Sequence, residues 1–306
     1  MQFRQLRYFV KIVEAGSFSR AAATIHVAQP ALSQQIAELE ERLGLKLLQR
    51  SARGVTPTAA GEVLFREASS ILHQLDQLPG IVRSSSGDPE GAVSLGLAYS
   101  LANTLIGPLV SRVQTSLPKV KLKLSDADSR SLGAGVVSNS LDMAVVYEDE
   151  LVSAFSRRPI FRHRMYLIGS QSSFNKASVS IDEIATLPLV LPGLPNGRRS
   201  LIDRAFAERG FTPNVVAEAD TLSSELSAVR TGIAHTILPV ANQERFLKDG
   251  FLEPLMVEPG IFLTCSIISS SDFPLSHAGE AVRNLLIEFI ENELRKMGMM
   301  GVEWLA

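Results

Sequence analysis

Two glutamines, a proline and a serine gather at the start of one predicted helix and could read the edges of nucleic-acid bases. They occur in the run Gln29-Pro30-Ala31-Leu32-Ser33-Gln34. A glutamine side chain can pair with adenine through two hydrogen bonds, and a serine hydroxyl can bond several base edges. The unpaired amides at the start of the helix can bind a phosphate. Gln29, Pro30, Ser33 and Gln34 are therefore candidate DNA contacts.

The neighbouring residues predict a helix-turn-helix at about residues 18–37. Gly16 is expected to end an earlier helix, and Ser17 to cap the next one. Pro30 suits the first position of the second helix because that position has no N–H partner to lose. An apolar stripe at helical spacing lies opposite the polar face and consists of Leu32, Ile36, Leu39 and Leu43. An ordinary helical hairpin inside a core is the alternative interpretation.

A basic hairpin is predicted directly after this helix, which Gly44 closes. Two short extended runs, 45–49 and 55–58, flank a turn that contains Arg50 and Arg53. Both arginines are candidates for contacts with the DNA backbone or the minor groove. Residues 1–61 hold eight Lys and Arg against four Asp and Glu, whereas the whole chain has a formal net charge of −2. A local basic charge is typical of a DNA-reading module.

One long helix is predicted next, over residues 59–87. Its apolar positions alternate spacings of four and three, which suits pairing with a second copy of the helix: Leu64, Ala68, Ile71, Leu75, Leu78 and Val82. The alternative is a single amphipathic helix packed on its own domain. Pro79 is expected to end or kink the helix near Leu78. A polar run at 84–91 marks the domain boundary.

Together these segments resemble the LysR-type transcriptional regulators. The shared motifs are Leu6-Arg7-Tyr8-Phe9, Gly16-Ser17-Phe18, Ala21-Ala22, Gln29-Pro30-Ala31-Leu32-Ser33, Leu39-Glu40, Leu43-Gly44, Leu47-Leu48-Gln49-Arg50 and Thr58-Ala59-Ala60-Gly61. Leu48 departs from the family, which most often has Phe there. The resemblance implies an α+β multidomain fold: a winged helix-turn-helix domain (1–58), a linker and dimerisation helix (59–87) and a two-lobed α/β effector-binding domain of periplasmic-binding-protein type (88–306). Lobe I is expected at about 92–163 and 269–306, and lobe II at about 164–268.

Strands and helices alternate beyond residue 91, which favours mostly parallel sheets covered on both faces. About two hundred residues is long for one such sheet, so two lobes are reasonable. Strands are expected at 92–98, 120–124, 143–147, 164–169, 187–191, 215–219 and 263–269. Helices are expected at 101–117, 131–137, 199–209, 222–231 and 277–297. By resemblance, the last helix returns to the first lobe.

Ligands of open α/β sheets bind beyond the carboxyl ends of the strands, where helix N-termini converge. The candidate effector contacts there are Ser100, Leu101, Ser129, Asn196 and Arg198. Hydroxyls and helix amides suit a small anion, to which Arg198 could add charge. By resemblance, Ser100 and Ser129 fall where family members hydrogen-bond a carboxylate of the inducer.

Two further residues belong to motifs of the family. Ala234 and His235 replace the usual small-then-aliphatic pair of a Gly-rich strand that leads to Leu-Pro. His235 is a candidate cleft residue that could tune ligand choice or pH response; the alternative is a satisfied structural histidine. Asp142 is interpreted as a turn residue before a core strand.

Catalytic and metal-binding motifs do not occur in the sequence. The five histidines lack metal-ligand spacing, and neither Gly-x-Ser-x-Gly nor a phosphate-binding loop is found. No catalytic residue, metal or cofactor is therefore expected. Cys265, the single cysteine, lies in an apolar run and is expected to be a buried small hydrophobe in a protein of the reducing cytoplasm. The N-terminus does not resemble a signal peptide, and no apolar run is long enough to cross a membrane.

The sequence therefore predicts a cytoplasmic bacterial transcriptional regulator that is not an enzyme. It would bind double-stranded promoter DNA and respond to a small, anionic effector between two lobes. A homodimer through the linker helix is expected, and the resemblance implies a homotetramer; RNA polymerase is a further candidate partner. Two alternatives remain: a solute-binding protein, which would need export, and a constitutive DNA-binding protein whose C-terminal part serves only assembly.

Overall fold

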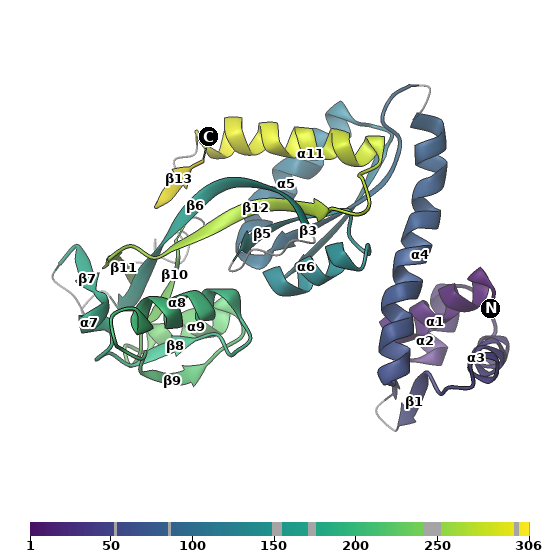
Figure 1. The fold of residues 1–306 in the computed structure, drawn as a ribbon, viewed down its shortest axis with the longest axis horizontal. Coiled ribbons are helices and arrows are strands. Elements are labelled where there is room, and N and C mark those ends of the chain that lie inside the picture. The colour runs from purple at the N-terminus through teal and green to yellow at the C-terminus, as the bar shows by residue number, and fades with distance from the viewer. Residues whose placement is uncertain are drawn as a thin grey trace.

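Three helices form an N-terminal head in the computed structural model, which describes residues 1–51, 54–84, 87–148, 155–170, 176–240, 252–296 and 300–305. They are α1 (Phe3–Ala15), α2 (Phe18–Thr24) and α3 (Gln29–Leu43). The head lies at one end of the molecule, beside a long helix that separates it from the rest of the chain (Figure 1).

The predicted turns and caps of the head are confirmed. Gly16 adopts a φ of 60° and ends α1, and Ser17 Oγ accepts the Arg20 N–H at 3.4 Å. Gly44 ends α3 with a φ of 65°. The apolar stripe of α3 is buried at its first three positions, whereas Leu43, the last residue of the helix, is 39% exposed.

A two-stranded wing follows, as the sequence predicted. Strands β1 (Leu48–Ser51) and β2 (Gly54–Pro57) pair in antiparallel register. The wing joins the helix-turn-helix through the Val55 N–H, which donates to the Gly16 carbonyl at 3.0 Å. The candidate contact Arg53 lies outside the described residues.

The linker helix α4 (Ala59–Ser84) begins at a capping residue and continues through a proline. Thr58 Oγ1 accepts the Gly61 N–H at 3.0 Å. The prediction that the helix ends near Leu78 is wrong, because α4 runs past Pro79 for five more residues. The last turns pack on the following strand, where Gln77 Nε2 donates to the Ala92 carbonyl at 2.8 Å. We attribute the continued helix to such tertiary contacts, which offset the hydrogen bond that proline removes.

The apolar seam of α4 is divided between two surfaces. Ala68 is buried in the core of the head, and Leu64 and Leu75 pack against that core. For these positions the alternative interpretation, packing on the helix's own domain, is correct. The other seam residues are exposed: Ile71 by 38%, Leu78 by 49% and Val82 by 69%. Neither α4 nor any other described helix is long and apolar enough to cross a membrane.

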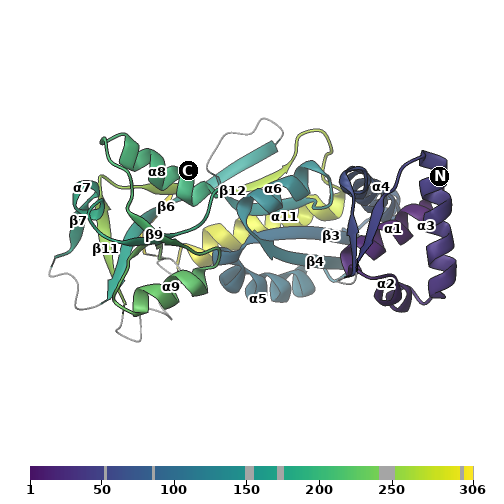
Figure 2. The ribbon, with the colours of Figure 1, turned by 90° about the horizontal axis from the view of Figure 1, so that it is seen from below.

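Lobe I contains the parallel strands that the sequence predicted. Strand β3 (Gly91–Ala98) lies between β4 (Val120–Ala127) and β5 (Met143–Glu148), parallel to both. Helices α5 (Tyr99–Ser116) and α6 (Ser129–Val137) lie on opposite faces of these strands (Figure 2). Helix α11 (His277–Phe289), which is followed by a π-helical turn (Ile290–Leu294), packs in the same core, so the last helix does return to this lobe.

Two strands continue from lobe I into lobe II: β6 (Phe155–Ser170) and β12 (Phe262–Ser270) (Figure 1). They pair with each other in antiparallel register, and β12 also pairs antiparallel with β5. The expectation of mostly parallel sheets is therefore wrong for the centre of the domain. The predicted strand at 164–169 is only the second half of β6.

Lobe II is built on the far half of β6. The flanking strands are β10 (Thr236–Pro239), β11 (Leu252–Glu258) and β7 (Ser178–Ser180), and a separate parallel pair consists of β8 (Leu189–Leu191) and β9 (Val215–Glu218). Its helices are α7 (Ile181–Ile184), α8 (Gly197–Ala207) and α9 (Leu222–Arg230). A terminal strand, β13 (Val302–Trp304), pairs with β6. The sequence analysis missed β7, β11 and β13.

The junction between the wing and α4 leaves no room for a side chain at Gly61. A Cβ atom there would lie 2.0 Å from the Leu47 carbonyl oxygen, which is held in place by the Thr58 N–H. We predict that Gly61→Ala lowers the free energy of unfolding by about 2 kcal/mol or more, because a backbone group must move. Gly107→Ala is the control: it lies inside α5 with open space around it and should stabilise by about 0.5–1 kcal/mol. Denaturant unfolding measures both; equal stability of Gly61→Ala and wild type would contradict the close approach.

Candidate DNA-contact surface and effector cleft

The polar face of α3 is open to solvent, as a base-reading surface requires. Gln29, Pro30 and Gln34 are exposed and Ser33 is half-buried. Gln29 Nε2 donates to Ser33 Oγ at 3.0 Å, so two candidate contacts are already held in one arrangement. The opposite face of the helix carries the buried stripe and packs in the head.

Glu38 shares this face, and the sequence analysis missed it. Gln34 Nε2 donates to one Glu38 carboxylate oxygen at 3.0 Å, and Gln35 Nε2 donates to the other at 2.9 Å. A glutamate in a major groove can accept from the cytosine amino group. The available signal was its spacing of four from Gln34, which puts both side chains on one helix face.

Arg50 lies on the wing strand β1, beside the helix-turn-helix. Its guanidinium carbon is 4.2 Å from the centre of the Phe18 ring, a cation–π contact. This contact fixes the arginine above the start of α2, where it can meet a DNA phosphate. Phe18 itself is only 6% exposed, so the platform is rigid.

Glu40 connects α3 to the wing from inside the head. One carboxylate oxygen accepts the Leu47 N–H at 2.9 Å and the Leu48 N–H at 3.2 Å, and the other accepts from Lys46 at 2.7 Å. Burial acts to raise the pKa of Glu40, but these hydrogen bonds outweigh it and lower the pKa. The carboxylate therefore remains charged and holds the first wing strand at a fixed place relative to the recognition helix.

The lobe I residues of the predicted effector site lie where strands β3 and β4 meet their helices. Ser100 is in the first turn of α5, and Ser129 is the first residue of α6. Ser129 Oγ accepts the Tyr147 N–H at 3.1 Å, which ties it to the end of β5. Leu101 corrects one expectation: its side chain is 2% exposed and packs in the lobe I core, so only its backbone amide, in the first turn of α5, remains a candidate contact.

Tyr147 and His163 complete this part of the site, and the sequence analysis missed both. The Tyr147 hydroxyl lies 3.0 Å from His163 Nδ1, and His163 Nε2 lies 3.2 Å from the Met300 carbonyl. Because a carbonyl only accepts, Nε2 carries the proton and Nδ1 accepts from the tyrosine. The Ser100 side chain lies near enough to the tyrosine to act on its pKa, which it lowers. No local motif marks the pair, which long-range strand pairing brings together.

Burial fixes the charge states of these two residues. His163 is 1% exposed, and burial lowers its pKa to about 4 although the Met300 carbonyl acts in the opposite direction. Burial also raises the pKa of Tyr147 well above its usual range. Both groups are therefore neutral at neutral pH, and the chain of hydrogen bonds keeps one direction.

The lobe II candidates are engaged with their own lobe. Asn196 Oδ1 accepts the Arg199 N–H at 3.2 Å and so caps α8. Arg198 forms an ion pair with Glu225 and donates to the Ile237 carbonyl at 3.2 Å. Glu225 is 1% exposed, so its charge and that of Arg198 balance each other inside the lobe. The structure thus gives Arg198 a structural partner that sequence reasoning did not foresee.

His235 is integrated into the backbone pairing of lobe II. Its N–H donates to the Pro188 carbonyl at 2.9 Å, and its carbonyl accepts the Val190 N–H at 2.8 Å. Burial lowers the pKa of the 8%-exposed side chain, with the Pro188 hydrogen bond acting in the opposite direction. The role of the His235 side chain in ligand choice or pH response stays a prediction. Cys265 is fully buried, and burial raises its pKa, which suits a small core residue rather than a nucleophile.

Comparisons with known proteins agree with this arrangement. Residues 3–62 match a family model described as the bacterial regulatory helix-turn-helix protein of the lysR family, and residues 86–291 match the LysR substrate binding domain. The chain is 34% identical to the nitrogen assimilation regulatory protein nac of Escherichia coli (strain K12), over 95% of this chain and 96% of that protein. It is 30% identical to the HTH-type transcriptional regulator BbuR of Bordetella bronchiseptica, over 98% and 91%.

Solved structures share the whole architecture. Full-length OxyR from Pseudomonas aeruginosa aligns with a TM-score of 0.69 at 22% identity and covers 95% of each chain. Full-length CbnR in complex with its target DNA aligns with a TM-score of 0.66 at 20% identity, over 95% of this chain and 99% of that one. At these identities the likeness concerns the fold.

The neutral state of His163 predicts an acid-sensitive fold. An unfolded histidine has a pKa of 6.5, whereas that of folded His163 is about 4. Protons therefore favour the unfolded chain between these values, and stability present above pH 6.5 is lost as the pH falls towards 4. The slope from this one group is at most about 1.4 kcal/mol per pH unit.

We expect His163→Gln, which cannot titrate, to flatten this dependence in urea unfolding measured across that pH range. His277→Gln, at an exposed position, is the control and should retain the wild-type slope. Equal slopes for wild type and His163→Gln would show that His163 does not bind protons more weakly in the folded chain.

Proposed function

Because this chain belongs to the LysR family of transcriptional regulators, we propose that α3 reads promoter sequence through its exposed polar face and that Arg50 binds the DNA backbone. The chain is a DNA-binding transcriptional regulator whose promoter binding is modulated by a small-molecule effector in its two-lobed domain. The observation that carries the residue assignment is the face itself, with Gln29, Ser33 and Gln34 held by hydrogen bonds and accessible to solvent.

The assignment divides DNA recognition into two kinds of contact. Gln29, Ser33 and Gln34 bond base edges in the major groove, and Pro30 lets the helix approach closely. Arg50, supported by Phe18, meets a phosphate and sets affinity and register without reading sequence. Arg53 is assigned the same role from its place in the sequence.

Assembly follows from the exposed part of the α4 seam. Ile71, Leu78 and Val82 expose apolar surface at spacings of seven and four, which fits a second copy of the helix. A dimer of this kind places two recognition helices on an interrupted palindromic site. We infer a homodimer, two of which associate as a homotetramer, with RNA polymerase as a further partner at the promoter.

The effector site is proposed between the lobes, at Ser100, Ser129 and the amide of Leu101. Ser129 Oγ accepts the Tyr147 N–H, which leaves its own O–H to donate to a ligand. The Ser100 hydroxyl, in the first turn of α5, supplies the second polar side chain. Asn196, Arg198 and His235 are assigned to the lobe II wall. With Arg198 paired to Glu225, a small anion would be bound mainly by neutral donors.

The remaining properties follow from the relatives. Proteins of this family named above are transcriptional regulators, so we infer that this chain has no catalytic activity of its own and needs no cofactor. Its DNA target places its activity in the cytoplasm.

A substitution on the base-reading face should separate specificity from affinity. We predict that Gln34→Ala and Ser33→Ala weaken binding to a selected site by about 1–3 kcal/mol per lost base contact, with little effect on random duplex. Arg50→Ala should weaken binding to all duplexes and make the salt slope shallower by about one. Fluorescence anisotropy with selected and random duplexes at several salt concentrations measures both. Equal losses from Gln34→Ala on the two duplexes would contradict its base-reading role.

The effector assignment predicts that the Ser129 hydroxyl is needed for an effector to raise the melting temperature of the protein. A panel of small carboxylates, aromatic acids and amino-acid-like compounds is screened for an upward shift in melting temperature. Ser129→Ala should abolish the shift of any active compound and keep wild-type DNA affinity, whereas Ser111→Ala, on the exposed face of α5, should respond normally. No shift with any compound, together with an unchanged DNA footprint, would favour the constitutive DNA-binding protein instead.

A further inference from the structure

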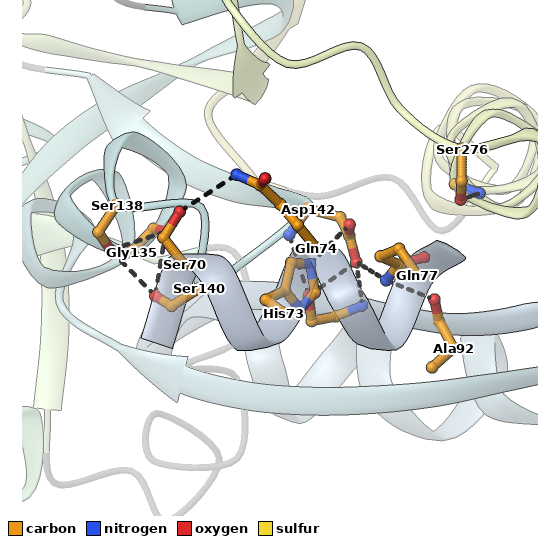
Figure 3. Close-up of polar contacts among 12 residues, drawn as sticks. Ser70, His73, Gln74, Gln77, Ala92, Gly135, Ser138, Ser140, Asp142 and Ser276 are labelled. Carbon is orange, nitrogen blue, oxygen red and sulfur yellow. Dashed lines mark hydrogen bonds and ion pairs between the residues drawn. The ribbon is translucent and has the colours of Figure 1, made fainter. Parts of the chain in front are cut away.

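Asp142 is a buried carboxylate that accepts hydrogen bonds both from lobe I and from the linker helix. Within lobe I, its Oδ2 accepts the Ser94 N–H at 2.6 Å and the Ser94 hydroxyl at 2.7 Å. From the linker helix, His73 Nε2 lies 2.9 Å from Oδ1, and Gln77 Nε2 donates to Oδ2 at 3.4 Å. Figure 3 shows both side chains reaching from α4 to the carboxylate. The interpretation of Asp142 as a turn residue is therefore incomplete.

The linker helix supplies donors that this carboxylate needs. A carboxylate only accepts, so His73 Nε2 carries the proton that points at it. The side chains of His73 and Asp142 are each 9% exposed, and Gln77 is 8% exposed. The packing of α4 over Asp142 shields the carboxylate from water, and His73 and Gln77 of the same helix donate to it in exchange. Docking of α4 is thus coupled to the satisfaction of Asp142.

Close backbone packing fixes the same face of the helix. His73, Gln77 and Gly80 recur at spacings of four and three, so they share one side of α4. A Cβ atom at Gly80 would lie 2.8 Å from the Glu90 carbonyl, and Gln77 also donates to the Ala92 carbonyl. At 100° per residue this side is opposite Ile71 and Leu78, so pairing with a second α4 leaves it undisturbed.

The contact lies at the ends of strands that also lead to the effector site. Ser94 is within β3, which runs on to Ser100, and Asp142 directly precedes β5, which ends near Tyr147. These strands are paired and covered on both faces, so lobe I is a stiff body between the contact and the cleft.

We propose that His73 and Gln77 are positioning residues that lock α4 to lobe I through Asp142, so that the DNA-binding head and lobe I turn as one body. An effector that changes the angle between the lobes then moves the head with lobe I. The inference about DNA rests on the proposed function, whereas the rigid coupling of head and lobe does not.

The coupling itself is tested by an intrachain distance. Spin labels at Arg42→Cys on α3 and Lys123→Cys on β4, both exposed positions, are measured by double electron–electron resonance. Labelled chains are diluted with unlabelled ones, and Cys265 is buried and should not react. We expect one narrow distribution for wild type and a broader one for His73→Ala and for Gln77→Ala. His73→Gln, which keeps a donor of similar reach, should restore the narrow distribution, and Gln74→Ala, on an exposed side of α4, should not change it.

The consequence for DNA is tested with duplexes selected from a random pool by the wild-type protein. His73→Ala should bind the full site at least about fivefold more weakly, in the usual range of coupling between sites, with less than about a twofold change on a single half-site. It should also discriminate less between half-site spacings. Equal losses on full and half sites would overturn the positioning role.

The two experiments fail in different ways. A narrow, unchanged distance distribution in both His73→Ala and Gln77→Ala would overturn the proposal whatever happens on DNA. If His73→Ala does not fold, Gln77→Ala alone decides by the same two measurements. If the wild type selects no duplex, the proposed function fails, and the distance measurement still decides the coupling.

Discussion

The antiparallel pairing of β6 with β12 connects lobe I to lobe II in the two-lobed domain. It extends from Phe155 opposite Ser270 to Arg164 opposite Phe262, and β6 then continues into lobe II to pair with β10 and β11. Buried backbone groups must be paired, so this ribbon cannot be broken without losing many hydrogen bonds at once. The lobes can therefore change their angle only by bending the ribbon. The terminal strand β13, on the other side of β6, reinforces it at the same place.

One residue of this ribbon takes part in the hydrogen bonds beside the proposed effector site. His163 is part of β6, and its Nδ1 accepts a hydrogen bond from the Tyr147 hydroxyl. These groups are neutral and have their hydrogen-bond directions fixed by the Met300 carbonyl. In lobe II, the charge of Arg198 is balanced by Glu225. The site proposed above would therefore recognise a ligand by placed donors and acceptors more than by net charge.

The linker helix connects this domain to the head, and its different faces contact different parts of the molecule. One face supports the core of the head through Ala68 and Leu72, and another carries exposed apolar residues suited to a second copy. A third face, with His73 and Gln77, meets Asp142 of lobe I. A rigid helix keeps these three surfaces at fixed angles. On the coupling proposed above, lobe I and the helix together set the direction in which the head presents α3.

The sequence by itself determined the elements whose signals are local. Gly16, Ser17 and Gly44 fix the ends of helices through backbone geometry, and the periodicity of α3 and α4 identifies their apolar faces, so the helix-turn-helix, the wing and the linker helix were all predictable. The parallel strands of lobe I were predictable for the same reason, because strand and helix periods alternate there.

Only the tertiary structure decided which distant residues meet. Local periodicity does not encode strand pairing, so β6 was predicted at half its length and the antiparallel centre of the sheet was missed. The partners of Asp142 come from residues 48 to 69 positions away in the chain, and Arg198 meets a glutamate 27 positions away. His163 meets Tyr147 only because β5 and β6 both pair with β12. Burial and long-range contact give these side chains their roles, and neither can be read from residue type and spacing alone.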